Sequence, residues 1–180
     1  MSQTFKKQLS SINMISEDLA YWIGVAQTDG YFKKQNYKKK QIIRYYICLS
    51  VAESSIEMLE KFKKVSKEIF YLKGSLWKNH KRNLTTYKFG CKNLLHLFKS
   101  LDIDFNDPPK PPSWIIEEEK YFGAYLAGII DGDGNVEVKR PQYPQCQGRI
   151  FSNKKQKDII NAIKKRFSCN VYTYNRKTKG

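Results

Sequence analysis

The fold of this chain is decided by the stretch Tyr125-Leu126-Ala127-Gly128-Ile129-Ile130-Asp131-Gly132-Asp133-Gly134, in which an apolar helix runs into two aspartates. A shorter version, Trp22-Ile23-Gly24-Val25-Ala26-Gln27-Thr28-Asp29-Gly30, occurs earlier. The Asp-Gly endings, at positions 29 and 133, lie 104 residues apart. This duplication predicts two equivalent helices that, packed side by side, bring Asp29 and Asp133 together at their C-terminal ends.

Small residues recur four positions apart in both copies. They are Ala20 and Gly24 in the first copy, and Ala124 and Gly128 in the second. Residues four apart share one face of a helix, and small side chains there let two backbones approach closely. We therefore expect these four residues to form the interface between the two helices.

Two carboxylates at C-terminal helix ends form an attractive position for a divalent cation. The helix ends carry partial negative charge, and the two acids repel each other unless a cation lies between them. Hard oxygen ligands favour Mg²⁺, with Mn²⁺ as the alternative. Metal held there against phosphates would turn water into a nucleophile and stabilise a leaving oxygen. An EF-hand is excluded because the required sixth-place glycine is Val136 and the twelfth residue is Gln142.

The composition indicates a polyanionic partner. The 180 residues include 33 Lys and Arg against 17 Asp and Glu, a formal charge of +16. Such a charge raises encounter rates with nucleic acid. Each duplex phosphate neutralised steepens the salt dependence of binding by roughly 0.9 on a log–log scale. Net charge alone does not separate DNA from RNA or from an anionic membrane.

Other features narrow the setting. No apolar run is long enough to span a bilayer, and residues 1–10 lack the apolar core of a signal peptide. We expect no membrane association and an intracellular protein, cytoplasmic or organellar, that is not secreted. The cysteines form no CxxC pair, so we expect reduced thiols and no zinc site. His80 and His96 are too few and too scattered for a catalytic triad.

The repeat also predicts the domain organisation. We expect a first unit over residues 1–105, a proline-rich linker over 106–112 and a second unit over 113–180. Prolines in the linker favour an extended spacer. Ser16 and Ser113 stand where N-caps of the two motif helices are expected.

On its two motifs the chain resembles the LAGLIDADG homing endonucleases in their single-chain, two-motif form. Residues 126–134 read LAGIIDGDG, and residues 22–30, WIGVAQTDG, keep the third-place glycine and the terminal Asp-Gly. The resemblance implies an α+β fold of two pseudo-symmetric αββαββα units. Their antiparallel sheets would form a saddle over duplex DNA.

The resemblance also implies a function. The protein would be a site-specific double-strand DNA endonuclease, encoded in an intron or intein, that binds a long asymmetric site as a monomer. Asp29 and Asp133 would hold the metal, each serving cleavage of one strand and leaving short 3′ overhangs. Two alternatives stay open: an RNA maturase that binds intron RNA to assist splicing, and a non-cleaving DNA-binding regulator on the same scaffold.

The periodicity after the first motif changes from helical to alternating. It predicts strands over residues 31–34 and 44–49, and a helix over 54–70. A hairpin over 75–80 and 85–91 and a helix over 93–101 complete the unit. The second unit ends before the counterparts of roughly residues 77–105, so we expect an open sheet edge there.

Alternation along the strands separates side chains that would face DNA from those that would face the helices. We place Phe32, Tyr45, Ile47, Trp77, Tyr87 and Phe89 towards the helices. The predicted DNA-facing residues of the first unit are Lys33, Gln35, Arg44, Tyr46, Lys78, His80, Thr86 and Lys88. Those of the second unit are Asn135, Glu137, Lys139, Gln147 and Arg149, with Tyr172, Tyr174 and Arg176 on a third strand.

The family commonly surrounds its metals with polar or basic side chains, and the resemblance gives three positions for them. Asn153 fits such a place in the second unit, whereas the matching place in the first unit holds the apolar Val51. Lys88 is a candidate charge stabiliser.

Overall fold

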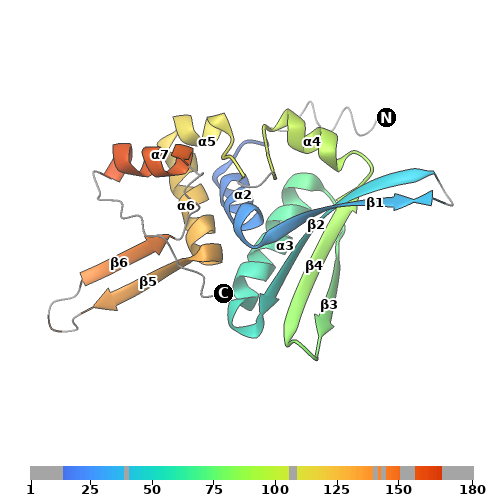
Figure 1. The fold of residues 1–180 in the computed structure, drawn as a ribbon, viewed down its shortest axis with the longest axis horizontal. Helices are drawn as coiled ribbons and strands as arrows, with labels where there is room; N and C mark the ends of the chain where they lie inside the picture. The colour runs from blue at the N-terminus through green and yellow to red at the C-terminus, as the bar shows by residue number, and fades with distance from the viewer. Residues whose placement is uncertain are drawn as a thin grey trace, which may run out of the picture.

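A computed structural model describes residues 14–38, 41–105, 109–139, 142, 145–150 and 157–167. Two helices, α2 (Glu17–Thr28) and α6 (Glu119–Asp133), lie side by side at its centre, with a sheet on either side (Figure 1). The other helices are α3 (Ile56–Phe70), α4 (Leu94–Ser100), α5 (Ser113–Glu117) and α7 (Lys157–Phe167). A short 3-10 turn, η2 (Glu53–Ser55), precedes α3. The protein is therefore α+β, as predicted.

The larger sheet is antiparallel, with strand order β1-β2-β4-β3. Its strands are β1 (Gly30–Tyr37), β2 (Ile42–Ala52), β3 (Ser75–Asn79) and β4 (Leu84–Cys91). The smaller sheet pairs β5 (Gly134–Lys139) with β6 (Gln145–Ile150). Each motif helix runs directly into the first strand of a sheet, so the helix ends fix where the two sheets begin.

The part of the core between α2, α3 and the larger sheet is built around Trp22 of α2. Its ring stacks on Phe62 at a centroid distance of 4.9 Å and meets Phe70 edge-on at 4.9 Å. Its indole N–H donates to the Ser66 hydroxyl at 2.8 Å, so its polar atom is satisfied although the side chain is fully buried. Truncating a core tryptophan typically costs about 3–5 kcal/mol. This packing fixes α2 against α3 and the sheet.

The helix starts agree only partly with the sequence. Ser16 caps α2 as expected, and its side chain accepts a hydrogen bond from the Leu19 amide at 3.1 Å. Ser113 does not cap the long second helix. It begins the short helix α5 and donates from its amide and its hydroxyl to the Asp102 carboxylate, at 3.0 and 3.2 Å. The chain then extends at Glu118, which separates α5 from α6.

No helix within the described parts of the chain is both long enough and apolar enough to cross a membrane.

Candidate active site and nucleic-acid interface

The two motif helices meet at Gly24 and Gly128. A Cβ at Gly24 would collide with the carbonyl oxygen of Tyr125 and lie 3.1 Å from the carbonyl carbon of Gly128. A Cβ at Gly128 would collide with the carbonyl oxygen of Tyr21 and lie 3.1 Å from the Cα of Gly24. Only glycine allows backbones to approach this closely. The two helices are therefore in contact at both glycines; of the two alanines predicted with them, Ala20 is buried and Ala124 is half-buried.

Two tyrosines hydrogen-bond across this helix pair. The Tyr21 hydroxyl donates to Asp131 Oδ2 at 2.7 Å, and the Tyr125 hydroxyl donates to Gln27 Oε1 at 2.8 Å. Each tyrosine precedes the aspartate of its own motif by eight residues, and each acceptor precedes its aspartate by two. The two bonds thus follow the 104-residue offset of the motifs, and they fix how the helices register against each other.

Further contacts anchor this arrangement. Gln27 Nε2 donates to the carbonyl oxygens of Asp104 and Lys110, at 2.6 and 2.9 Å, which ties both ends of the inter-unit connection to α2. The Lys61 ammonium lies over the Tyr21 ring, 3.4 Å from its centroid. Burial, followed by the hydrogen bond and charge of Asp131, raises the pKa of the Tyr21 phenol, so it stays a donor at all ordinary pH values.

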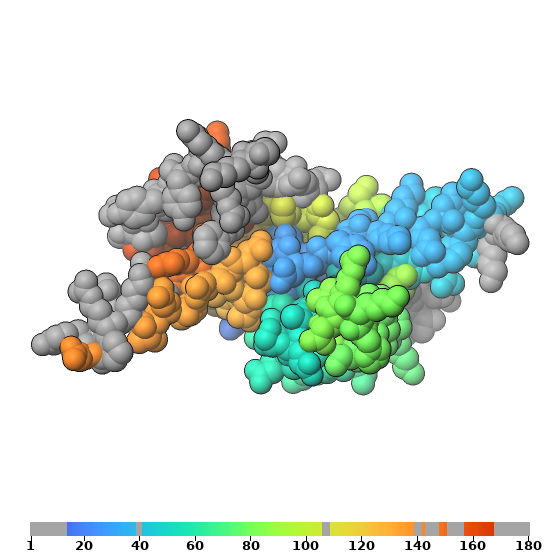
Figure 2. Space-filling view, turned by 60° about the horizontal axis from the view of Figure 1, so that its bottom comes forward, coloured from blue at the N-terminus to red at the C-terminus, as the bar shows by residue number. Residues whose placement is uncertain are grey.

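Asp29 and Asp133 lie where the two helices end. The Asp29 amide donates to the Val25 carbonyl at 3.0 Å, and Asp133 is the last residue of α6. Asp29 Oδ2 lies 3.6 Å from the point that a Cβ of Gly132 would occupy, so the carboxylate reaches the backbone next to Asp133. In Figure 2 the blue atoms of the first motif adjoin the orange atoms of the second. Asp29 lies close enough to Asp133 for the charge of one carboxylate to act on the other.

The surroundings disfavour a negative charge on Asp29. Partial burial, followed by the charge of Asp133, raises the pKa of the Asp29 carboxyl. Both side chains nevertheless remain accessible to solvent. A cation between them would relieve this repulsion.

The donor set suits a magnesium-like ion that keeps other ligands. Among the described residues, no group of three or more His, Cys, Asp or Glu side chains is arranged to hold a metal. Mg²⁺ typically uses one or two carboxylates and takes its remaining ligands from water and substrate phosphates. An accessible pair of carboxylates fits this description.

Two hydroxyls lie level with Asp29 on the first sheet. Gly30 pairs with Leu49, so Ser50 on β2 stands at the level of Asp29. Ser50 pairs with Thr86, and their hydroxyl oxygens are 2.8 Å apart. Thr86 is only 6% exposed, so the predicted DNA-contacting residue is instead buried beside Ser50. Val51 points into the core, and Ser50 is the polar residue that the sequence interpretation missed.

One face of the first sheet packs on the helices, and the other, which we call the open face, does not. The open face carries Tyr31, Lys33, Gln35, Arg44, Tyr46, Ser50, Trp77, Thr86 and Lys88, because these residues pair across the ladders or alternate with core residues. Strands β1 to β4 contain lysines and an arginine but no Asp or Glu. The sheet is therefore electropositive, as contact with phosphates requires.

The pairing of β3 with β4 places the side chains of β3 on the opposite faces of the sheet from those predicted. Trp77 pairs with Thr86 and so lies on the open face, 43% exposed, instead of facing the helices. Lys78 pairs with Thr85 on the opposite side, and its ammonium lies 3.8 Å from the Glu53 carboxylate. His80 follows the end of β3 in an exposed turn. The predicted placement of Lys78 towards DNA is wrong.

Tyr46 and Lys88 both lie on the open face, but the burial of Tyr46 rules out the direct DNA contact predicted for it. Tyr46 is 8% exposed, too buried to contact DNA directly. The Lys88 ammonium lies over the Tyr46 ring, 3.8 Å from its centroid. Because Tyr46 is further from Asp29 along the ladder than Lys88 is, the ammonium is directed away from the aspartates. The role of Lys88 as a charge stabiliser beside the metal therefore gains no support from this arrangement.

On the smaller sheet, Asn135, Glu137 and Arg149 share one face of the β5–β6 hairpin, and their contact with DNA stays a prediction. The Arg149 guanidinium lies 3.2 Å from the Glu137 carboxylate. Lys139 and Gln147 belong to the same ladder, where they pair with Gln145 and Glu137. Four further predicted residues, Asn153, Tyr172, Tyr174 and Arg176, lie outside the described residues.

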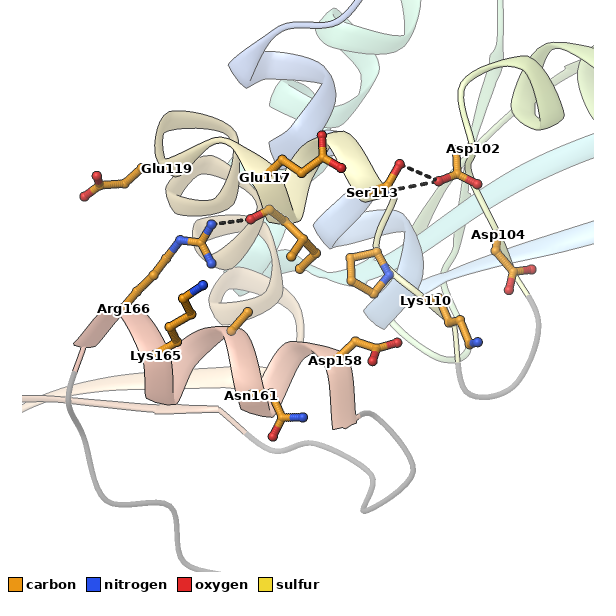
Figure 3. A pocket seen from close by; sticks show the side chains of 13 residues that line it. Asp102, Asp104, Lys110, Ser113, Glu117, Glu119, Asp158, Asn161, Lys165 and Arg166 are labelled. Atoms are coloured by element: carbon orange, nitrogen blue, oxygen red, sulfur yellow. Dashed lines mark hydrogen bonds between the residues drawn. The ribbon is translucent and has the colours of Figure 1, made fainter.

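A cavity of about 1120 Å³ is lined by residues of α5, α6, α7 and the chain before α5, and neither Asp29 nor Asp133 is among them (Figure 3). Its charged lining includes Asp102, Asp104, Glu117, Glu119 and Asp158, together with Lys110, Lys165 and Arg166. Arg166 donates to the Ile116 carbonyl there. Because carboxylates gather at this cavity and are absent from strands β1 to β4, the larger sheet is the favoured surface for a polyanion.

The fold is similar to that of several solved structures. No protein-family model and no curated protein matches the sequence. The structure matches I-DmoI in complex with DNA and Ca at a TM-score of 0.60 and 16% identity, covering 86% of this chain and 73% of that one. A mutant of I-SmaMI matches at 0.58 and 12%, covering 92% and 76%.

Two further matches extend this result. The LAGLIDADG homing endonuclease I-LtrWI bound to target DNA matches at a TM-score of 0.52 and 14% identity, covering 86% of this chain and 74% of that one. Against a mesophilic variant of the homing endonuclease I-DmoI, the match spans only 60% of that protein, at 0.51 and 16%. The chain therefore has the fold of the LAGLIDADG homing endonucleases.

Proposed function

We propose that this protein is a site-specific DNA endonuclease of the homing type, which hydrolyses phosphodiester bonds with a divalent metal held by Asp29 and Asp133. The observation that carries the proposal is the convergence of these two carboxylates at the helix pair, beside an electropositive sheet. A shared fold alone does not specify an activity, whereas two neighbouring carboxylates beside a basic sheet have a definite chemistry.

The chain's own residues have three tasks in this proposal. The glycines and tyrosines at the contact between α2 and α6, which we call the helix seam, bring the two aspartates together and hold them there. These residues are Gly24, Gly128, Tyr21 and Tyr125. Asp29 and Asp133 would supply the protein oxygens for Mg²⁺ or Mn²⁺. Basic residues on the open face, such as Lys33 and Arg44, would hold the duplex across the helix ends, because arginine and lysine contact phosphates and base edges.

The metal, when bound, supplies an activated water and stabilises charge on the scissile phosphate. In the hydrolysis, an oxygen of water bonds to phosphorus while the bond from phosphorus to a sugar oxygen breaks, and that oxygen leaves with a proton. The two units differ in sequence, so the two halves of the target should differ, and one chain with two units should act as a monomer.

The proposal is tested on a duplex that the protein selects for itself. Duplexes that bind are enriched from a random pool, cloned into a supercoiled plasmid and incubated with protein in Mg²⁺ or in EDTA. We expect linear plasmid in Mg²⁺ only. Asp29→Asn and Asp133→Asn should bind the site without linearising the plasmid.

Asp131→Asn is the matched control. It removes one charge from the same helix, yet an amide oxygen still accepts from Tyr21, as Gln27 does from Tyr125. We expect it to cleave. A wild-type protein that binds the site but never cuts it would identify a non-cleaving regulator, and cleavage by both aspartate variants would refute the assigned site.

A further inference from the structure

Tyr46 is enclosed in a stack on the open face of the first sheet. Gly90 is its partner across the β2–β4 ladder, and a Cβ at Gly90 would lie 2.6 Å from Tyr46 Cδ1. The ring therefore lies over the bare backbone of Gly90. The Lys88 ammonium rests on the ring, 3.8 Å from its centroid. The resulting order is backbone, aromatic ring and cation.

The Tyr46 hydroxyl is also engaged. It lies 2.8 Å from the hydroxyl of Tyr37, on the neighbouring strand. The Arg44 guanidinium carbon lies 5.9 Å from the centroid of the Tyr37 ring. Tyr46 thus cannot rotate without losing contacts on two strands, and its orientation is fixed before any ligand arrives.

A lysine held in this way differs from a lysine on a free surface. Its side chain is ordered by the ring, so less rotamer freedom remains to be lost when the ammonium meets an anion. Lysine acts as a compact point charge, which suits a phosphate better than the two-point hydrogen bonding that reads a base. The open face contributes no carboxylate that would compete for it.

We propose that Tyr46 is a positioning residue that holds Lys88 ready to contact one backbone phosphate of DNA bound to the first unit. The proposal rests on the DNA substrate proposed above. It gives Tyr46 no direct contact with DNA, and it makes Lys88 a source of affinity that does not depend on base sequence.

The test measures duplex binding against salt concentration in EDTA, where no cleavage occurs. A plot of the logarithm of the binding constant against the logarithm of the salt concentration should be less steep for Lys88→Met, by about 0.9. Between about 50 and 200 mM salt the variant should therefore lose about 3.5-fold less affinity than the wild type. Tyr46→Leu, which removes the ring, should also make the salt dependence less steep. Tyr46→Phe keeps the ring and should keep the wild-type slope.

Lys64→Met on α3 is the matched control, because it removes one exposed lysine away from the open face and should leave the slope unchanged. A slope that is unaltered in Lys88→Met, or that is altered in Lys88→Met but not in Tyr46→Leu, would overturn the proposal. A wild-type protein that binds and does not cleave would count against the endonuclease assignment only.

A second measurement on the unaltered protein covers the case in which Tyr46→Leu does not fold. The ring current of Tyr46 should shift the Lys88 ε-methylene proton resonances upfield, both in the free protein and on duplex DNA. Resonances at the position of a free lysine in either state would contradict the positioning role.

Discussion

Two glycine-to-alanine substitutions in α6 should change the stability of the protein in opposite directions, because only one of the glycines lies at the helix seam. Gly128→Ala places a methyl group against the backbone of α2, 3.0 Å from the Val25 nitrogen and 3.1 Å from the Gly24 Cα. Backbone atoms cannot rotate away, so the helices must separate. Gly123→Ala is the matched control, because nothing lies within 4 Å of its Cβ.

The magnitudes follow from these surroundings. Alanine gains up to about 1 kcal/mol of helix propensity over glycine at either position. Overpacking costs about 1–3 kcal/mol, and contact with backbone places Gly128→Ala near the upper end. We expect Gly123→Ala to be stabilised and Gly128→Ala to be destabilised, with a gap of about 2–3 kcal/mol between them. In a protein of this size the gap corresponds to about 4–12 °C in melting temperature.

Thermal unfolding followed by circular dichroism measures the gap, and plasmid cleavage measures its consequence. Gly128→Ala should also lose cleavage at temperatures where it remains folded, because separating the helices separates Asp29 from Asp133. If Gly128→Ala were as stable and as active as Gly123→Ala, the close approach of the helices would be refuted.

Two further predictions concern the same site. Tyr125→Phe should lower the free energy of unfolding by about 1 kcal/mol, because it removes the hydroxyl that donates to Gln27. Chemical denaturation measures this change. The control is Tyr71→Phe, which should have no effect because the Tyr71 side chain is 59% exposed. The pKa of Asp29 is raised from 3.8 in the folded protein, so its contribution to stability falls as the pH rises through the interval between the unfolded and folded values. Without divalent metal, Asp29→Asn should therefore have a higher melting temperature than the wild type at neutral pH. The difference should shrink as the pH is lowered toward 3.8. Equal melting temperatures at neutral pH would contradict the burial and repulsion assigned to Asp29.

Local signals in the sequence were enough to predict which faces of α2 and α6 form the helix seam. Small residues at Gly24 and Gly128 and the paired Asp-Gly endings identify which surfaces of the helices meet, because helical periodicity is a local property. The tyrosine bonds across the seam were not predicted. A signal for them exists, since Tyr21 and Tyr125 occupy equivalent positions in the two motifs.

The open face was predicted less completely, because sheet pairing is not local. Alternation fixed the sides of β1, β2 and β4, but the phase of β3 depends on its pairing with β4, and there Trp77 and Lys78 exchanged sides. The burial of Tyr46 depends on the bare backbone of Gly90, 44 positions along the chain. No periodicity within either strand indicates that contact.

The most direct test of the central claim is a crystal structure of the protein on its selected duplex, with Mn²⁺ located by anomalous scattering. We expect a peak at about 2.1 Å from a carboxylate oxygen of Asp29 or Asp133 and from an oxygen of the scissile phosphate. A metal bound elsewhere, or a scissile phosphate remote from both aspartates, would contradict the account.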